Sequence, residues 1–93
     1  MGVEEVTLNI EQLIPMAKAL SSSTRVSILR LLSKENCDVS TIAKKLRQTE
    51  ANISAQIKIL EKVGLVKSYY EPGDHGVRKI CTLKVRRIIL SII

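Results

Sequence analysis

Residues 39–63 decide the fold; they read VSTIAKKLRQTEANISAQIKILEKV. Apolar side chains recur at the i, i+3, i+4 and i+7 spacing of one helix face from Val39 to Leu46, and both lysines of this segment lie off that face. The spacing predicts a short amphipathic helix. The next three residues, 47–49, break the pattern and predict a turn.

A second helix is predicted after this turn. The Thr49 hydroxyl can accept a hydrogen bond from the backbone amides that a helix start leaves free. Ile53, Ile57 and Leu60 then follow at i, i+4 and i+7 and form the core face. Gly64 ends the helix, because glycine adopts a positive φ without a steric penalty. The two helices and the turn predict a helix-turn-helix at 39–63.

A basic hairpin is predicted to follow. Residues 65–71 and 77–83 are rich in β-branched and aromatic side chains, and they flank the sequence Pro72-Gly-Asp-His-Gly76. Proline and two glycines between two such runs predict a hairpin with a five-residue loop. A basic hairpin directly after a helix-turn-helix is typical of a wing, here spanning residues 65–83.

Two helices are predicted before the helix-turn-helix. The first has an apolar face and ends near Leu20. Pro15 leaves two possibilities open: the helix starts at the proline, or it runs from about Leu8 and is kinked. Hydroxyl side chains at 21–24 can cap the second helix, over residues 24–33.

The last ten residues, 84–93, predict a C-terminal helix that carries an aliphatic stripe. Leu90 and Ile93 fall off that stripe and would expose an apolar patch on a monomer. Burial of this patch against a second copy and the first helix predicts a two-fold dimer. The alternative is a tail whose isoleucines complete the monomer core. The predicted dimer interface comprises Leu13, Ala17, Val85, Ile88, Ile89, Leu90, Ile92 and Ile93.

The chain of 93 residues predicts one domain, mainly α with a small β-hairpin, in the order α-α-α-α-β-β-α. Within this domain, residues 1–20 form the N-terminal helix region and 84–93 the dimerisation helix. No apolar run reaches the 18 residues of a membrane span, and the acidic start lacks the pattern of a secretory signal, so we expect a cytoplasmic protein. One histidine and no glycine-rich phosphate loop disfavour an enzyme, and no cofactor is expected.

Charge favours a polyanionic partner. The net charge is +6, and all 15 basic residues lie at or after Lys18. The alternative is a solvated basic surface that only maintains solubility. On a helical wheel with Ile53 in the core, Ala51 and Ala55 lie near the opposite side with Lys58 and Lys62. We expect this side of the second helix to face the major groove of DNA.

The side chains on that side have suitable chemistry. Asn52 can bond adenine through two hydrogen bonds, as can a neighbouring glutamine, and an alanine can contact a thymine methyl group. Lysine and arginine neutralise phosphates and supply affinity rather than sequence information. Glu50 is expected to serve the helix start.

Two segments carry a family resemblance. Residues 18–32, KALSSSTRVSILRLL, resemble the opening of ArsR-type winged helix-turn-helix regulators, and residues 52–66, NISAQIKILEKVGLV, resemble their recognition helix and entry to the wing. The match covers roughly residues 11–84. The resemblance implies a homodimeric, sequence-specific regulator of transcription, usually a repressor, that binds double-stranded DNA. The predicted two-fold dimer places two recognition helices about one DNA turn apart, so the predicted operator is an inverted repeat.

By position, the resemblance gives the family's recognition-helix places to Thr49, Ala51, Asn52, Ser54, Ala55 and Gln56 and its wing places to Arg78 and Lys79. The complete predicted set is Lys44, Lys45, Arg47, Gln48, Thr49, Ala51, Asn52, Ser54, Ala55, Gln56, Lys58, Lys62, Lys67, His75, Arg78 and Lys79.

Metal sensing is not expected. Metal-responsive members of the family carry a Cys-x-Cys type site where this chain reads Asn36-Cys37-Asp38-Val39, with one cysteine, and residues 84–93 offer no ligand. No metal or small-molecule effector is therefore predicted. In winged-helix folds the segment before the third helix pairs with the distal wing strand, which could bring Cys37 near Cys81. The two form a candidate disulfide, with reduced buried thiols as the alternative.

Two other functions compete with a sequence-specific regulator. A winged helix can serve as a protein-protein interaction module, although such a module more often presents aromatic or aliphatic side chains than a basic face. A non-specific architectural protein would coat DNA through charge alone. RNA binding is disfavoured because Tyr69 and Tyr70 are the only aromatic side chains available for stacking.

Overall fold

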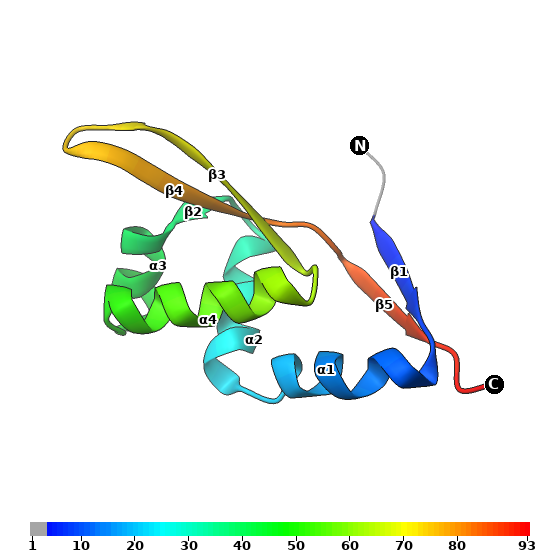
Figure 1. The fold of residues 1–93 in the computed structure, drawn as a ribbon. Helices are drawn as coiled ribbons and strands as arrows, with labels where there is room; N and C mark the ends of the chain where they lie inside the picture. The colour runs from blue at the N-terminus through cyan, green and yellow to red at the C-terminus, as the bar shows by residue number, and fades with distance from the viewer. Residues whose placement is uncertain (1–3) are drawn as a thin grey trace.

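The computed structural model describes residues 4–93. Met1–Val3 lie outside the described residues. The expected absence of a secretory signal and the start of the predicted domain partly depend on these three residues. Figure 1 shows the order of elements, which is β1 (Glu5–Leu8), α1 (Ile10–Leu20), α2 (Ser23–Leu32), β2 (Cys37–Asp38), α3 (Val39–Leu46), α4 (Glu50–Lys62), β3 (Val66–Gly73), β4 (Gly76–Leu83) and β5 (Arg87–Leu90).

Capping side chains set the ends of the helix-turn-helix. The Asp38 carboxylate accepts a hydrogen bond from the Thr41 amide at 2.8 Å and begins α3. Arg47 ends α3 with a left-handed backbone, φ 56°. Thr49 caps α4 by accepting from the Asn52 amide at 3.0 Å, and Gly64 follows α4 with φ 81°. The predicted helix-turn-helix is confirmed.

The helices α2, α3 and α4 share one core with the three-stranded sheet. The largest fully buried side chains are Ile28, Ile42, Ile53, Ile57, Leu60 and Cys81. The three from α4 are those that the helical spacing assigned to its core face. Burial of this face fixes the rotation of α4 about its axis and therefore decides which residues α4 exposes.

Pro15 lies inside α1, which runs without interruption from Ile10. The helix therefore does not start at the proline. Asn9 and Gln12 form a reciprocal cap at its start, with hydrogen bonds of 3.0 and 3.1 Å. Pro15 is exposed, so the carbonyl group that loses its hydrogen-bond partner faces water.

The wing belongs to an antiparallel sheet with the order β2-β4-β3. Its loop is shorter than predicted, because the ladder continues to Gly73 opposite Gly76 and leaves only residues 74–75 between the strands. Pro72 takes part in β3 because β3 is an edge strand, where a missing N–H group need not break the ladder. The long hairpin extends past α3 and the start of α4 (Figure 1).

The predicted C-terminal helix is wrong. Residues 87–90 form strand β5, which pairs in parallel with β1, so that Glu5 lies opposite Arg87 and Leu8 opposite Leu90. β-Branched isoleucines favour a strand, and the partner strand lies some eighty residues away in the sequence. Figure 1 shows β1 and β5 side by side at the opposite end of the molecule from the wing tip. None of the helices within residues 4–93 is long and apolar enough to cross a membrane.

Candidate nucleic-acid interface

The outward face of α4 is exposed, as the sequence predicted. Ala51, Ala55, Lys58 and Lys62 are all exposed, whereas the residues of the core face have no accessible surface. Small side chains at the first two positions allow a DNA base edge to approach the helix backbone. The same face of α4 therefore has the shape and the charge that major-groove contact requires.

The predicted contacts gather around the turn and the first half of α4. Lys44 and Arg47 are exposed and have no ion pair among residues 4–93. Gln48 and Thr49 are exposed beside them, and Ser54 is half-buried. Lys45 is also exposed, but its ammonium group lies 2.6 Å from Glu35 Oε1, and this contact raises the pKa of Lys45. The free cations of the turn are available to phosphates, and Lys45 is partly neutralised.

An open groove of about 470 Å³ separates this turn region from the wing. It is lined by the starts of α3 and α4 and by the wing tip. The charged side chains of its lining are the cations Lys44, Arg78 and Lys79 and the carboxylates Asp38, Glu50 and Asp74. His75 is exposed at the tip. The groove is thus mixed in charge rather than uniformly basic.

The basic residues of the wing are held by carboxylates. Arg78 lies 2.6 Å from Glu71 and 3.6 Å from Asp38, and the hydrogen bond to Glu71 raises the pKa of Arg78. Lys79 lies 3.3 Å from Glu61 of α4. Arg78 and Lys79 are both predicted from the sequence to contact DNA. Their carboxylate partners could not be predicted, because these residues are separated in the sequence and only the fold brings them together. Arg78 is exposed and Lys79 half-buried, so Arg78 is the more accessible of the two.

Two predicted contacts lie away from the turn. Lys62 is at the last turn of α4, where it lines a shallow hollow with Leu8 and Glu11 of the N-terminal region. Lys67 is at the base of the hairpin, opposite Thr82 and far along the strand from the tip. Lys62 still shares the exposed face of α4 with Lys58, four residues before it, whereas Lys67 lies apart from the other predicted contacts.

A row of amide side chains runs along one side of α4. Gln56 donates to Asn52 at 3.1 Å, and Asn52 donates to Gln48 at 2.9 Å. Arg25 of α2 donates to Gln56 at 2.5 Å. The three amides are predicted from the sequence as separate DNA contacts, and Arg25 is not among the predicted residues. Asn52 and Gln56 lie four residues apart on one side of α4, and Gln48 lies in the turn four residues before Asn52, so this regular spacing was the signal that the three amides adjoin.

The two cysteines lie directly opposite each other on β2 and β4, as the sequence analysis expected of a winged helix. Both are free thiols in the core, and burial raises the pKa of each. Directly opposed residues of an antiparallel pair have Cα atoms about 4.5 to 5.5 Å apart, which is within the range of a disulfide. A Cys37–Cys81 disulfide stays a prediction, and the mass of the intact, unreduced protein decides it.

The described residues contain no group of three or more histidine, cysteine, aspartate or glutamate side chains that could hold a metal ion. Cys37 has the Glu35 carboxylate near its sulfur, at 3.8 Å, but no third ligand joins them. The pair alone does not make a metal site, because structural metals require three or four ligands.

The comparisons with solved structures agree on the fold. HlyU from Vibrio cholerae N16961 is 22% identical, with a TM-score of 0.70 over 80% of this chain and 76% of that chain. The homodimeric winged helix-turn-helix DNA-binding domain of a possible ArsR-family transcriptional regulator from Mycobacterium bovis is 27% identical, with a TM-score of 0.72 over 81% of this chain and 66% of that chain. The structure of a PadR family transcription regulator from Clostridium difficile R20291 is 29% identical, with a TM-score of 0.60 over 67% of this chain and 72% of that chain.

Sequence comparisons identify the family. A search of the curated proteins gives no match. The model of the bacterial regulatory proteins of the arsR family matches residues 22–68, which include α2, the whole helix-turn-helix and the start of the wing. This match spans just over half of the chain. The protein therefore belongs to the ArsR family, and it is a winged helix-turn-helix regulator of transcription that binds DNA rather than an enzyme.

Proposed function

We propose that the protein is a sequence-specific repressor that binds double-stranded DNA as a homodimer and acts in the cytoplasm on an inverted-repeat operator. The observation that supports this most strongly is the exposed face of α4, where two alanines and Lys58 lie outside the core beside the amide row. This face combines close approach, hydrogen-bonding groups and positive charge, the three properties that base recognition in the major groove requires.

The free cations at the turn favour contact with the phosphates that flank the recognised bases. Lys44 and Arg47 lie at the end of α3, and Lys58 on the exposed side of α4. Contacts of this kind fix the orientation of the helix on the duplex and give the affinity a strong salt dependence. The wing adds Arg78 at its exposed edge, which must exchange Glu71 or Asp38 for a phosphate if it binds DNA.

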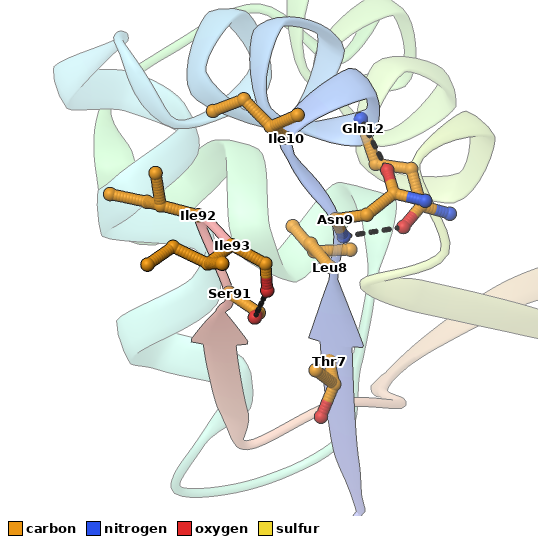
Figure 2. A pocket seen from close by; sticks show the side chains of 8 residues that line it. All are labelled: Thr7, Leu8, Asn9, Ile10, Gln12, Ser91, Ile92 and Ile93. Carbon is orange, nitrogen blue, oxygen red and sulfur yellow. Dashed lines mark hydrogen bonds between the residues drawn. The ribbon is translucent and has the colours of Figure 1, made fainter.

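The terminal elements supply a surface for the second copy. We define the terminal apolar surface as the exposed side chains of α1, β5 and the residues after β5, namely Ile10, Ile14, Ala17, Ile88, Ile89, Leu90, Ile92 and Ile93. Figure 2 shows Ile10, Ile92 and Ile93 around a hollow of about 250 Å³ next to Leu8 and the Asn9–Gln12 cap. A parallel sheet of two strands is normally covered on its faces, so this surface favours association.

The exposed area supports the same proposal. The chain exposes 6406 Å², whereas a compact monomer of this size exposes about 5,400 Å². A stable interface buries about 800 Å² on each partner, which is comparable with this difference. From the predicted interface, Leu13 and Val85 are half-buried, and Val85 packs against the monomer core.

Selection from a pool of random duplexes tests the proposed function. Protein is incubated with the pool at several salt concentrations, and the bound duplexes are sequenced. Enrichment of an inverted repeat with half-sites about one helical turn apart is the expected result. Binding that depends steeply on salt but enriches no sequence would identify an architectural protein, and no binding at low salt would favour a protein-protein interaction module.

A further inference from the structure

We propose that Arg25 is a positioning residue that fixes the order of hydrogen-bond donors and acceptors along α4. Through this order, Arg25 determines which base-pair edge Asn52 binds. This inference rests on the proposed DNA-reading role of α4. It assigns a specificity role to a residue of α2 that lies outside the predicted set of DNA contacts.

The Arg25 guanidinium group is held from two helices. Its Nε donates to the Ala19 carbonyl at 2.7 Å, and its Nη2 donates to the Lys18 carbonyl at 3.0 Å. Both carbonyl groups belong to the last turn of α1, and the Lys18 carbonyl also accepts from the amide and the hydroxyl of Ser21 at 3.2 and 2.7 Å. The remaining nitrogen, Nη1, donates to Gln56 Oε1 at 2.5 Å. The two hydrogen bonds to α1 orient Nη1 of Arg25 toward Gln56 of α4.

A guanidinium group imposes a direction on the amide beside it. Arginine has five N–H donors and no acceptor, so only the oxygen of Gln56 can face Arg25. The NH₂ group of Gln56 must then point the other way, and it donates to Asn52 Oδ1 at 3.1 Å. A neutral partner such as serine could accept or donate and would leave both amide directions open.

The same constraint passes to the next amide. Because Asn52 Oδ1 faces Gln56, its NH₂ group faces Gln48 and donates to Oε1 at 2.9 Å. The row therefore has one polarity from Arg25 to Gln48. Bonds to ionised groups are about twice as strong as neutral ones, so the cation at the start of the row decides that polarity.

Asn52 keeps one donor and one acceptor for DNA. An amide has two N–H donors and two oxygen lone pairs, and the row occupies one of each. Adenine presents an N7 acceptor and an N6 donor in the major groove, which match this remaining pair. Turning the Asn52 amide over would exchange the positions of donor and acceptor. A fixed amide therefore discriminates an A·T pair from the same pair reversed.

Gln56→Leu tests the row and leaves the bonds from Arg25 to α1 in place. Lys58→Met is the matched control, because Lys58 lies on the same helix outside the row. The first measurement is the NMR resonances of the side-chain NH₂ groups in the free protein. We expect Gln56→Leu to shift those of Asn52 and Gln48, and Lys58→Met to leave them in place. Unchanged Asn52 and Gln48 resonances in Gln56→Leu would overturn the inference.

The second measurement is affinity for the selected duplex and for duplexes in which each A·T pair is reversed in turn. We expect the wild type to bind one reversed duplex about tenfold more weakly. Gln56→Leu and Arg25→Gln should reduce this ratio to about threefold or less. A tenfold ratio retained in Gln56→Leu contradicts the role of Arg25. Wild-type protein that binds all duplexes alike contradicts the proposed function instead, and the NMR measurement still decides whether the row exists.

Discussion

The Nζ atom of Lys79 lies 3.3 Å from Oε1 of Glu61, so an ion pair joins strand β4 of the wing to the last turn of α4. Both side chains are half-buried. The wing and the recognition helix are therefore held in one arrangement by a contact that no local pattern of residues predicts. A cation committed to this contact is not available to a phosphate.

Lys79→Met tests this arrangement. We expect the variant to bind every duplex a few times more weakly, because the wing loses its contact with α4, but to keep the slope of log K against log salt concentration. Lys58→Met is the comparison: it removes an exposed cation and should lower that slope by about one. A slope lowered by about one in Lys79→Met as well would mean that Lys79 leaves Glu61 for a phosphate.

Asn52→Ala tests base recognition. Loss of the amide should reduce discrimination between the selected operator and its single-base variants by about 1 to 3 kcal/mol at one position. Affinity for random DNA should change little. Titration of both variants against the same panel of duplexes is the measurement, with Lys58→Met expected to weaken all of them equally. An equal, sequence-independent loss in both variants would show that α4 does not read bases through Asn52.

Asp38→Ala tests the cap of α3 through pH. Hydrogen bonds from the Thr41 side chain and amide lower the pKa of Asp38 in the folded protein, and Arg78 lowers it further. A carboxylate with a lowered pKa stabilises the fold above its unfolded pKa of about 4, and this contribution disappears as pH falls through the folded value. We expect the variant to lose about 1 kcal/mol of unfolding free energy at neutral pH.

Urea unfolding of Asp38→Ala and the wild type at pH 7 and at pH 3 measures this effect. The difference between the two proteins should shrink at the lower pH, because protonation removes the carboxylate from the wild type. Asp38→Asn, which keeps a capping oxygen, should lose less stability at pH 7. A difference that stays constant between the two pH values would exclude the ionised carboxylate as the stabilising group.

Ile92→Ser tests the terminal apolar surface. Ile92 is 70% exposed in the monomer, and Val77 at the wing is 73% exposed. If a second copy covers the terminal surface, Ile92→Ser should weaken the dimer and Val77→Ser should not, because only the first removes apolar area from the interface. Sedimentation equilibrium measures both. Equal dimer affinities for Ile92→Ser, Val77→Ser and the wild type would place the interface elsewhere.

Local patterns were sufficient to predict the helix-turn-helix. Spacing identified the core of α4, and the two ends of α4 depend on Thr49 and Gly64, whose roles follow from side-chain chemistry alone. Strand β5 could not be predicted in this way. Its isoleucines satisfy a helical spacing as well as a strand, and the choice depends on pairing with Glu5–Leu8 at the other end of the sequence.

The candidate site also combines features that local sequence patterns predict with features that depend on tertiary packing. Exposure of Ala51 and Ala55 follows from the core face of their own helix. The bonds from Arg25 to Gln56 and from Lys79 to Glu61 join elements that tertiary packing brings together, and spacing within one element carries no information about them. The exposed face was therefore predictable, whereas the contacts that orient its side chains were not.

DNA cleavage from Lys62→Cys, which leaves the two small residues of α4 in place, tests the central claim most directly. An introduced thiol on the exposed face of α4 can carry an iron chelate that cleaves nearby DNA, while Cys37 and Cys81 are buried and their raised pKa values disfavour labelling. On the selected duplex, α4 in the major groove of both half-sites predicts two centres of cleavage about one helical turn apart. Cleavage spread evenly along the duplex, or none above the level of the same label at Asn36→Cys, would contradict the account.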